Sequence, residues 1–211
     1  MPEYVFRIAA VVLYIPFVQI RKSWRKRILA HLKEKPTLER KPLRERWLLG
    51  VLGLTNLPLF VWFFGPWLDF AHVGLPEWAR WGGAAIVAAG VWYFWRTHVA
   101  LAQNWTPLLE VREGNTLVTT GPYRLVRHPM YSSSFVIDAG FALLSANWLV
   151  AVPLLAGMVV LYAVRVNDEE ALMLDAFGDE YRAYMDRTGR LMPRLSALSG
   201  RGPSARGDLD G

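Results

Sequence analysis

Long uncharged runs alternate with short, strongly basic segments along this chain. Residues 47–68 (WLLGVLGLTNLPLFVWFFGPWL) contain no charged residue, and the same holds for residues 81–95 and 139–164. A helix that crosses the hydrocarbon core of a bilayer needs about 20 mainly apolar residues. Helices buried in a soluble bundle would instead carry charges on one face at every turn. The pattern therefore favours helices that lie in a membrane.

The apolar runs predict five membrane helices, over residues 4–20, 47–68, 78–101, 133–146 and 148–166. We expect Asn147 and Trp148 to form the tight bend of a helical hairpin between the last two. The first run could be mistaken for a signal peptide, but its basic residues follow the apolar stretch and no small-residue cleavage site is present. We therefore interpret it as a retained helix.

A shorter amphipathic helix is predicted after the last membrane helix. Leu174, Phe177, Tyr181 and Tyr184 recur at spacings of three and four, which gives one aromatic face. That face either packs on the membrane or the core, or closes a lid over a site. Residues 196–211 are small, polar and glycine-rich, and we expect a disordered tail there.

These elements define the predicted fold class. It is an all-α, polytopic membrane helix bundle with about five transmembrane helices and a C-terminal cytoplasmic amphipathic helix. We expect residues 1–195 to form a single domain.

The distribution of basic residues predicts the orientation of the bundle. Residues 21–46 carry eleven lysines and arginines, whereas the loop 69–77 carries none. Cytoplasmic loops of membrane proteins are enriched in these residues. With the N-terminus outside and five crossings, residues 21–46, residues 103–130 and the C-terminal segment all lie in the cytoplasm. The protein would reside in the inner membrane of a bacterium or the endoplasmic reticulum of a eukaryote.

The overall charge does not require a nucleic-acid partner. A net charge of +6 and an isoelectric point near 9.8 are accounted for by the positive-inside topology and by attraction to anionic lipid headgroups. The partners that we expect are the bilayer itself and a lipid-like substrate.

Several kinds of site are excluded or disfavoured by composition. The chain contains no cysteine, so a disulfide, a thiolate zinc site and a cysteine nucleophile are impossible. The four histidines are scattered without a His-x-x-x-His pair, and no metal site is expected. No Gly-x-Gly-x-x-Gly motif follows a strand-like run, so a Rossmann sheet is not predicted.

A dense polar cluster, GPYRLVRHPMY at residues 121–131, interrupts the apolar pattern on the cytoplasmic side. Pro122 and Pro129 disfavour helix before them, so we expect a shaped loop and a helix that starts at Ser132 or Ser133. Arginine offers a rigid fork of donors for carboxylate or phosphate, and tyrosine and histidine add aromatic faces with polar tips. The cluster suits either a flat anionic ligand or anchoring at the headgroups.

A second cluster, Asp168, Glu169 and Glu170, follows the last membrane helix. Carboxylates at the C-terminal end of a helix lie at the negative pole of its dipole, which is unfavourable. They therefore need cationic partners or a positively charged ligand.

The two clusters occur in an order that resembles the integral-membrane methyltransferases of the isoprenylcysteine carboxyl methyltransferase and phospholipid N-methyltransferase group. The similarity covers roughly residues 96–195. The matching positions, in order along the chain, are Arg127, His128, Pro129, Tyr131, Glu169, Glu170, Phe177, Gly178, Glu180, Tyr181, Arg190 and Pro193.

The resemblance implies S-adenosylmethionine bound in a cavity on the cytosolic side, and methyl transfer to a lipid-soluble acceptor. The cofactor-binding residues would be Tyr123, Arg127, His128, Pro129, Tyr131, Glu169 and Glu170. Arg127 and His128 suit the carboxylate of the cofactor, either Glu169 or Glu170 suits its ammonium group, and the tyrosines suit adenine and the methyl group.

The resemblance also implies two catalytic residues. Arg190 would orient an acidic acceptor, and His128 or a nearby carboxylate would be the base for an amine acceptor. Asp138, within the fourth predicted helix, should face the protein interior. The sequence does not decide between an isoprenylcysteine-like carboxylate and a phospholipid amine.

Two other functions are compatible with the pattern. One is an NADPH-dependent membrane reductase of the sterol type, which shares a similar C-terminal half but is longer. The other is a membrane scaffold without catalytic activity. Binding of S-adenosylmethionine, of NADPH or of neither distinguishes the three.

The predicted topology can be tested with reporter fusions at residue 73 and at residue 200. We expect them to localise on opposite sides of the membrane, with residue 200 in the cytoplasm, because the basic residues are so unequally distributed. Reporters on the same side would contradict the five-helix interpretation.

Overall fold

The protein is a bundle of helices with very little strand. The computed structural model describes residues 1–31, 38–39, 42–106, 110–112 and 114–194. Its α-helices are α1 (Glu3–His31), α2 (Pro42–Leu54), α3 (Leu57–Phe64), α4 (Glu77–Leu101), α5 (Pro129–Ser145) and α6 (Trp148–Arg187). Three short 3₁₀ helices, η1 (Pro66–Ala71), η2 (Ala102–Asn104) and η3 (Gly121–Arg124), lie between them. The predicted mainly helical fold is confirmed.

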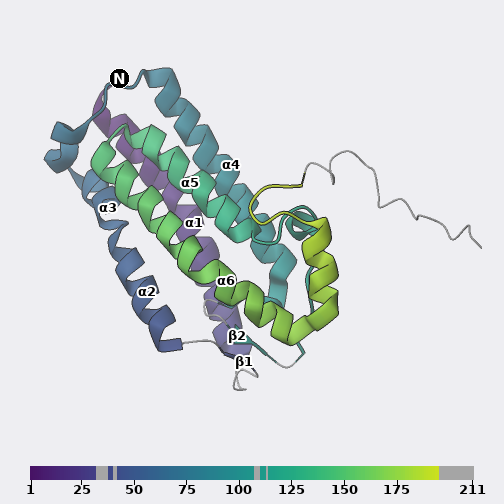
Figure 1. The fold of residues 1–211 in the computed structure, drawn as a ribbon. Helices are drawn as coiled ribbons and strands as arrows, with labels where there is room; N and C mark the ends of the chain where they lie inside the picture. Colours follow the sequence, from purple (N-terminus) through teal and green to yellow (C-terminus); the bar gives the residue numbers. More distant parts are fainter. Residues whose placement is uncertain (32–37, 40–41, 107–109, 113, 195–211) are drawn as a thin grey trace, which may run out of the picture.

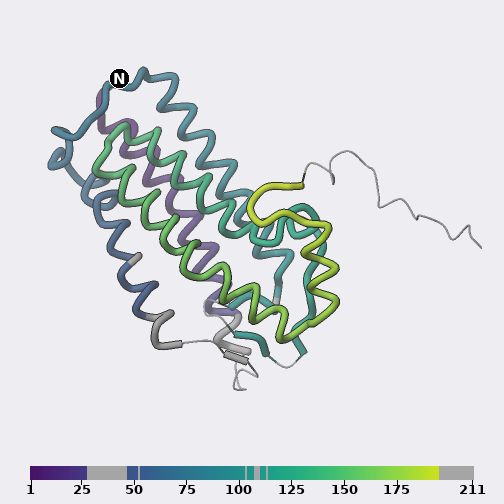
Figure 2. The backbone as a smooth tube through the Cα atoms, in the orientation of Figure 1, coloured from purple at the N-terminus to yellow at the C-terminus, as the bar shows by residue number. Residues whose placement is uncertain are grey.

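The helices run roughly along a common axis (Figures 1 and 2). The helices α2 and α3 follow one another in the same direction, whereas the other successive helices reverse direction. α5 packs between α4 and α6, and α1 packs against α3, α4 and α5. The N-terminus and η1 lie at one end of the bundle, whereas the C-terminal part of α6 lies at the other (Figure 1). At that second end β1 (Leu38–Glu39) pairs antiparallel with β2 (Glu110–Val111). The basic segments therefore gather at the end opposite the N-terminus, as the charge pattern predicted.

Among the described residues, two helices are long and apolar enough to cross a membrane, judged by length and composition alone. They are α1, over Glu3–Arg27, and α6. The count of five spans stays a prediction. The helices nevertheless expose large apolar side chains, as a lipid-facing surface requires. Near the N-terminal end of the bundle, aromatic residues of the kind enriched at membrane interfaces are more than half exposed: Phe64, Trp67, Phe70, Trp78 and Trp148.

The prediction of a single helix over residues 47–68 is wrong. The chain instead forms α2 and α3, with a turn at Thr55–Asn56, and then an extended Gly65 and η1. Pro58 lies in the first turn of α3, where its missing N–H is not needed. The two prolines of this run, Pro58 and Pro66, each begin a new helical segment rather than continue the previous one.

Other predicted boundaries also shift. α1 continues to His31, so the first basic segment is partly helical. α5 begins at Pro129 rather than at Ser132 or Ser133, because proline is well tolerated at the first position of a helix. The predicted hairpin bend is present, but it lies one residue earlier than the predicted Asn147–Trp148. Ala146 is in the left-handed region (φ 47°), Asn147 caps α6 through its side chain, and Trp148 is already the first residue of α6. The predicted tail, residues 196–211, lies outside the described residues.

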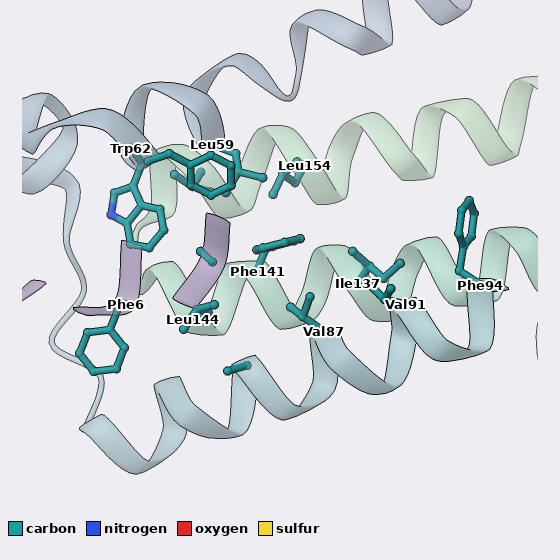
Figure 3. Close-up of a cluster of buried hydrophobic side chains, with 14 residues drawn as sticks. Phe6, Leu59, Trp62, Val87, Val91, Phe94, Ile137, Phe141, Leu144 and Leu154 are labelled. Carbon is teal, nitrogen blue, oxygen red and sulfur yellow. The ribbon is translucent and has the colours of Figure 1, made fainter. Parts of the chain in front are cut away.

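Aliphatic and aromatic side chains together fill the centre of the bundle (Figure 3). Tyr14 of α1 contacts the rings of Phe60, Phe63 and Phe141, with centroid distances of 5.3, 5.6 and 6.0 Å. Phe141 is 1% exposed. Within a bilayer, lipid tails are as apolar as these residues, so close packing rather than removal from water stabilises such contacts.

α4 and α5 approach closely because glycines face each other at their contact. A Cβ atom on Gly83 would lie 2.6 Å from the backbone nitrogen of Leu144 and 2.8 Å from the carbonyl oxygen of Gly140. A Cβ atom on Gly140 would in turn lie 2.7 Å from the backbone nitrogen of Val87. Small residues at helix contacts in membranes allow this approach. The α4–α5 pair is therefore the tightest part of the scaffold.

Arg80 joins three elements at the N-terminal end of the bundle. Its guanidinium forms two hydrogen bonds with the Glu3 carboxylate, at 2.7 and 2.8 Å, and its Nε donates to the Leu144 carbonyl at 3.0 Å. It also stacks over the Phe6 ring. Arg80 is only 4% exposed, so this arginine ties α1 and the end of α5 to α4.

The close approach of α4 and α5 predicts that Gly83→Val strongly destabilises the protein. Overpacking costs about 1–3 kcal/mol or more, and here the contacts are backbone atoms that cannot move aside. Gly82→Val is the matched control, since a Cβ atom there meets nothing within 4 Å. Thermal unfolding in detergent should show a clearly lower midpoint for the first variant alone. Equal midpoints would contradict the packing.

Candidate active site

The polar cluster that the sequence singled out is held by the chain that returns after α6. The backbone N–H of Arg127 donates to the carbonyl of Gly189 at 2.8 Å, and the N–H of His128 donates to the carbonyl of Arg190 at 3.0 Å. Residues 189–191 thereby run beside residues 125–128, as a parallel bridge between Val126 and Gly189. This pairing brings the two most distant motifs of the chain into contact (Figure 2).

A kink within α6 makes this return possible. Gly178 has φ 51° and ψ −123°, which is not helical, although the helix continues on both sides of it. A residue with a Cβ atom rarely adopts a positive φ, so glycine is required here. The kink turns the last part of α6 back over the end of the bundle that lies opposite the N-terminus (Figure 1). Tyr181 and Tyr184, on this last part, are each 2% exposed.

The Glu170 carboxylate is the centre of the site. Its Oε1 accepts from Arg127 Nε at 3.1 Å, lies 3.2 Å from His128 Nε2, and accepts from Arg190 Nε at 3.2 Å. Its Oε2 accepts from Arg190 Nη2 at 2.7 Å. Glu170 is only 4% exposed, so these three side chains take the place of water around the carboxylate.

The partners of Glu170 determine its charge. Burial by itself raises the pKa of a carboxyl group, but the hydrogen bonds from His128, Arg190 and Arg127 outweigh burial and lower the pKa of Glu170 to about 2. The carboxylate is therefore ionised at neutral pH. A buried carboxylate with two arginines forms a network that would be costly to break by removing one member.

Glu169, the neighbouring carboxylate, has a different environment. Its Oε2 accepts a hydrogen bond from the Tyr131 hydroxyl at 2.9 Å, and its Oε1 lies 4.0 Å from His128 Nδ1. The side chain is 31% exposed and lines a cavity. Of the two glutamates, Glu169 is thus the one that a ligand can reach.

Arg127 and Tyr184 hold the last part of α6 in place. Besides Glu170, the Arg127 guanidinium donates to the backbone carbonyls of Met185 and Thr188. The Tyr184 hydroxyl donates to the carbonyl of Tyr123 at 2.7 Å, and burial raises the pKa of Tyr184 so that it stays protonated. Both side chains therefore connect the end of α6 to the polar loop.

A cavity of about 160 Å³ lies beneath this part of α6. Arg127, His128, Tyr131 and Glu169 line one side of it. Phe177, Tyr181 and Tyr184 also line it, which confirms that the aromatic face of the amphipathic helix points into a site. The remaining wall comes from α6 and from the connector between α4 and η3, including Trp105, Glu110, Thr116 and Arg165.

Sequence reasoning did not identify the connector wall. Asn104 Oδ1 accepts from Asn115 Nδ2 at 2.9 Å and from the backbone N–H of Thr116 at 3.2 Å, which joins the end of α4 to the connector. Glu110 pairs with Arg112 at 2.9 Å. These residues have no periodic pattern, and the only signal for them was the general similarity of the connector.

The structure brings most of the predicted site residues together. Arg127, His128, Glu170 and Arg190 share one network, with Tyr131 and Glu169 beside it; Tyr123 lines the cavity. Pro129 is buried and starts α5. The described lining of the cavity does not include four of the predicted residues, namely Pro129, Asp138, Glu170 and Arg190. No group of three or more potential metal ligands is present in the described part of the chain.

Comparison with known proteins identifies related chains. The phospholipid methyltransferase family matches residues 78–180. The cobalt-zinc-cadmium resistance protein CzcN of Cupriavidus metallidurans is 34% identical over 89 residues, covering 42% of this chain and 41% of the relative. Protein-S-isoprenylcysteine O-methyltransferase B of Arabidopsis thaliana is 28% identical over 97 residues, covering 45% and 49%. The chain spans about half the length of the curated relatives it matches.

The fold has a counterpart among solved structures. It resembles the structure of a eukaryotic intramembrane Ras methyltransferase, an isoprenylcysteine carboxyl methyltransferase, with a TM-score of 0.53 and 20% identity over 84% of this chain and 67% of the other. The family match includes both the Arg127–Tyr131 segment and the Glu169–Glu170 pair. Over residues 78–180 the chain is therefore similar to the phospholipid methyltransferase family, its relatives include an isoprenylcysteine O-methyltransferase, and its fold resembles that of an isoprenylcysteine carboxyl methyltransferase.

Proposed function

We propose that the protein transfers a methyl group from S-adenosylmethionine to a lipid-soluble acceptor at the cytoplasmic face of the membrane. The observation that carries this proposal is the cavity, in which a reachable carboxylate, cationic side chains and aromatic rings converge from separate elements. The Arabidopsis relative is named an isoprenylcysteine O-methyltransferase. Both the chemistry of the cavity and the family support the same reaction class.

The residues of the cavity fit the chemical groups of this cofactor. S-adenosylmethionine carries an ammonium group, a carboxylate, adenine and a sulfonium methyl group, and it supplies the activated methyl. Glu169, being exposed to the cavity, is suited to the ammonium group. Arg127 provides positive charge for the carboxylate, His128 provides a ring nitrogen for a hydrogen bond to it, and Tyr123, Tyr181 and Phe177 provide apolar faces.

The division between the two glutamates refines the roles expected from the sequence. Glu170 accepts from three side chains and is buried, so we assign it to holding the site together. Arg190 belongs to the same network, because its guanidinium donates hydrogen bonds to the Glu170 carboxylate. Its side chain is 46% exposed, which leaves it within reach of an acidic acceptor.

The protein accelerates such a reaction mainly by position. Methyl transfer between two bound molecules is an in-line displacement, so alignment and exclusion of water account for much of the rate. The aromatic cover formed by the end of α6 would provide both. A carboxylate acceptor is ionised at neutral pH and needs no base, whereas an amine acceptor would use His128 or Glu169.

The assignment of the glutamates predicts different outcomes for their alanine variants. Glu169→Ala should lower the affinity for S-adenosylmethionine by about ten- to hundredfold, the loss of one charge-assisted hydrogen bond, without changing the unfolding midpoint. Glu170→Ala should lower the unfolding midpoint as well, because it leaves Arg127 and Arg190 without their common partner.

Calorimetric titration and thermal unfolding in detergent measure these two effects. Asp179→Ala is the matched control, since Asp179 is an exposed carboxylate on the same helix that pairs only with Arg182 of the next turn. Unchanged cofactor affinity in the Glu169 variant would remove it from the binding site. A normal midpoint in the Glu170 variant would contradict its structural role.

The membrane location of the site predicts how affinity depends on the acceptor tail. If the tail enters sideways from the bilayer, each buried methylene contributes about 0.8 kcal/mol, or roughly fourfold in apparent affinity. At fixed detergent, lengthening the tail of a minimal acceptor should lower its KM steeply until the opening is filled. Equal turnover of a headgroup without a tail would refute lateral entry while leaving the methyl-transfer proposal intact.

A further inference from the structure

Arg21 is an arginine on the inward-facing stripe of α1. Tyr14, Phe17, Arg21 and Trp24 follow one another at spacings of three, four and three, so they share one face of the helix. Tyr14 packs on Phe141, and the other two aromatic residues of the stripe pack on α4: Phe17 on Phe94 at 4.9 Å and Trp24 on His98 at 6.0 Å. Arg21 thus lies between two side chains that face the interior of the bundle.

The position of Arg21 differs from that of a surface anchor. Its stripe neighbours Tyr14, Phe17 and Trp24 are all partly buried, yet the Arg21 side chain is exposed. The guanidinium is 6.0 Å from the Phe17 ring centroid. The Arg21 side chain is therefore accessible beside rings that are packed into the bundle.

The electrostatic surroundings of Arg21 are positive. The charged groups that influence it are Arg165 of α6 and Arg25, one turn further along α1, and the Tyr14 hydroxyl and the His98 ring are also within electrostatic reach. Within the described part of the chain, no carboxylate forms an ion pair with Arg21. Guanidinium groups close together near the membrane repel one another, and the interaction grows as water is excluded. An anion beside Arg21 would relieve this repulsion.

Arg21 also lies next to the cavity. Trp24 contacts His98, and His98 contacts Trp105 at 5.1 Å. Trp105 and Arg165 both line the cavity. Contacts through Trp24, His98 and Trp105 therefore connect the face of α1 that carries Arg21 to the wall of the cavity where the cofactor would bind.

We propose that Arg21 binds the oxyanion head group, phosphate or carboxylate, of a lipid that enters between α1 and α6. Arg21 lies where the apolar part of α1 ends and its basic part begins. We expect lipid head groups to lie at this depth of the membrane. The proposal rests on the proposed function in one respect, that this lipid is the methyl acceptor. The arginine would hold the head group beside the cavity while the tail stays in the bilayer.

Three probes test this site in the full-length protein, purified in an uncharged detergent. They are dodecyl phosphate, dodecanoate and inorganic phosphate, each titrated while the thermal unfolding midpoint is measured. A ligand that binds only the folded protein raises the midpoint according to its concentration and affinity. We expect one or both amphiphilic anions to raise the midpoint at concentrations where inorganic phosphate has no effect, and the stronger of them identifies the head group.

Arg21→Gln should weaken binding of the amphiphilic anion by about ten- to hundredfold, as expected for the loss of a charge-assisted hydrogen bond. Lys22→Gln is the matched control, because Lys22 is an exposed, adjacent residue of the same charge. Arg21→Lys, which keeps the charge but not the fork, should retain part of the affinity. Equal weakening in the Arg21→Gln and Lys22→Gln variants, or equal stabilisation by inorganic phosphate, would overturn the proposal.

Titration with S-adenosylhomocysteine separates this site from the cofactor site. We expect the Arg21→Gln variant to bind S-adenosylhomocysteine as well as the unsubstituted protein does. Loss of that binding in the variant would overturn the proposal by showing that Arg21 maintains the structure of the cavity. If the unsubstituted protein fails to bind S-adenosylhomocysteine, the proposed methyl transfer fails, whereas the lipid site is still decided by the anion titrations.

Discussion

The arrangement of the end of the bundle opposite the N-terminus depends on one buried, ionised carboxylate, Glu170. Glu170 is surrounded by Arg127, His128 and Arg190, which come from the polar loop and from the segment after α6. An ionised carboxylate in such a place is stable only if its oxygens are satisfied by donors with good geometry. The loop, the last helix and the returning segment are therefore bound to a single arrangement, because any other one would leave a charge unpaired.

The bundle and the site are stabilised in different ways, and this difference has consequences for motion. The pair α4–α5 is joined by backbone contacts at Gly83 and Gly140 that leave no room for rearrangement. The cover over the cavity is instead held by polar contacts of Arg127 and Tyr184 with backbone carbonyls. Polar contacts of this kind can exchange with water where the chain leaves the bilayer. Movement that admits a cofactor is thus expected at Gly178 and beyond, not within the bundle.

Much of the fold was determined by the sequence. Uncharged runs bounded by basic segments predict which residues enter the bilayer, since charged groups are costly in hydrocarbon. The structure confirms the mainly helical fold and shows the hairpin bend one residue before its predicted position. Motif order also identified the family and named Arg127, His128, Glu169, Glu170 and Arg190. Where prediction failed, as over residues 47–68, both a turn and a continuous helix were compatible with the same apolar run.

Only the tertiary structure decided which environment each of these residues has, and therefore which role it can take. Adjacent glutamates look alike in sequence, yet Glu170 points into a network of donors and Glu169 faces a cavity. Periodicity does not reveal that Gly178 reverses the direction of α6, that the connector supplies a wall, or that Arg21 stays exposed beside packed aromatic residues. The reason is physical: each of these properties depends on which distant segments surround a side chain, and local pattern carries no information about those segments.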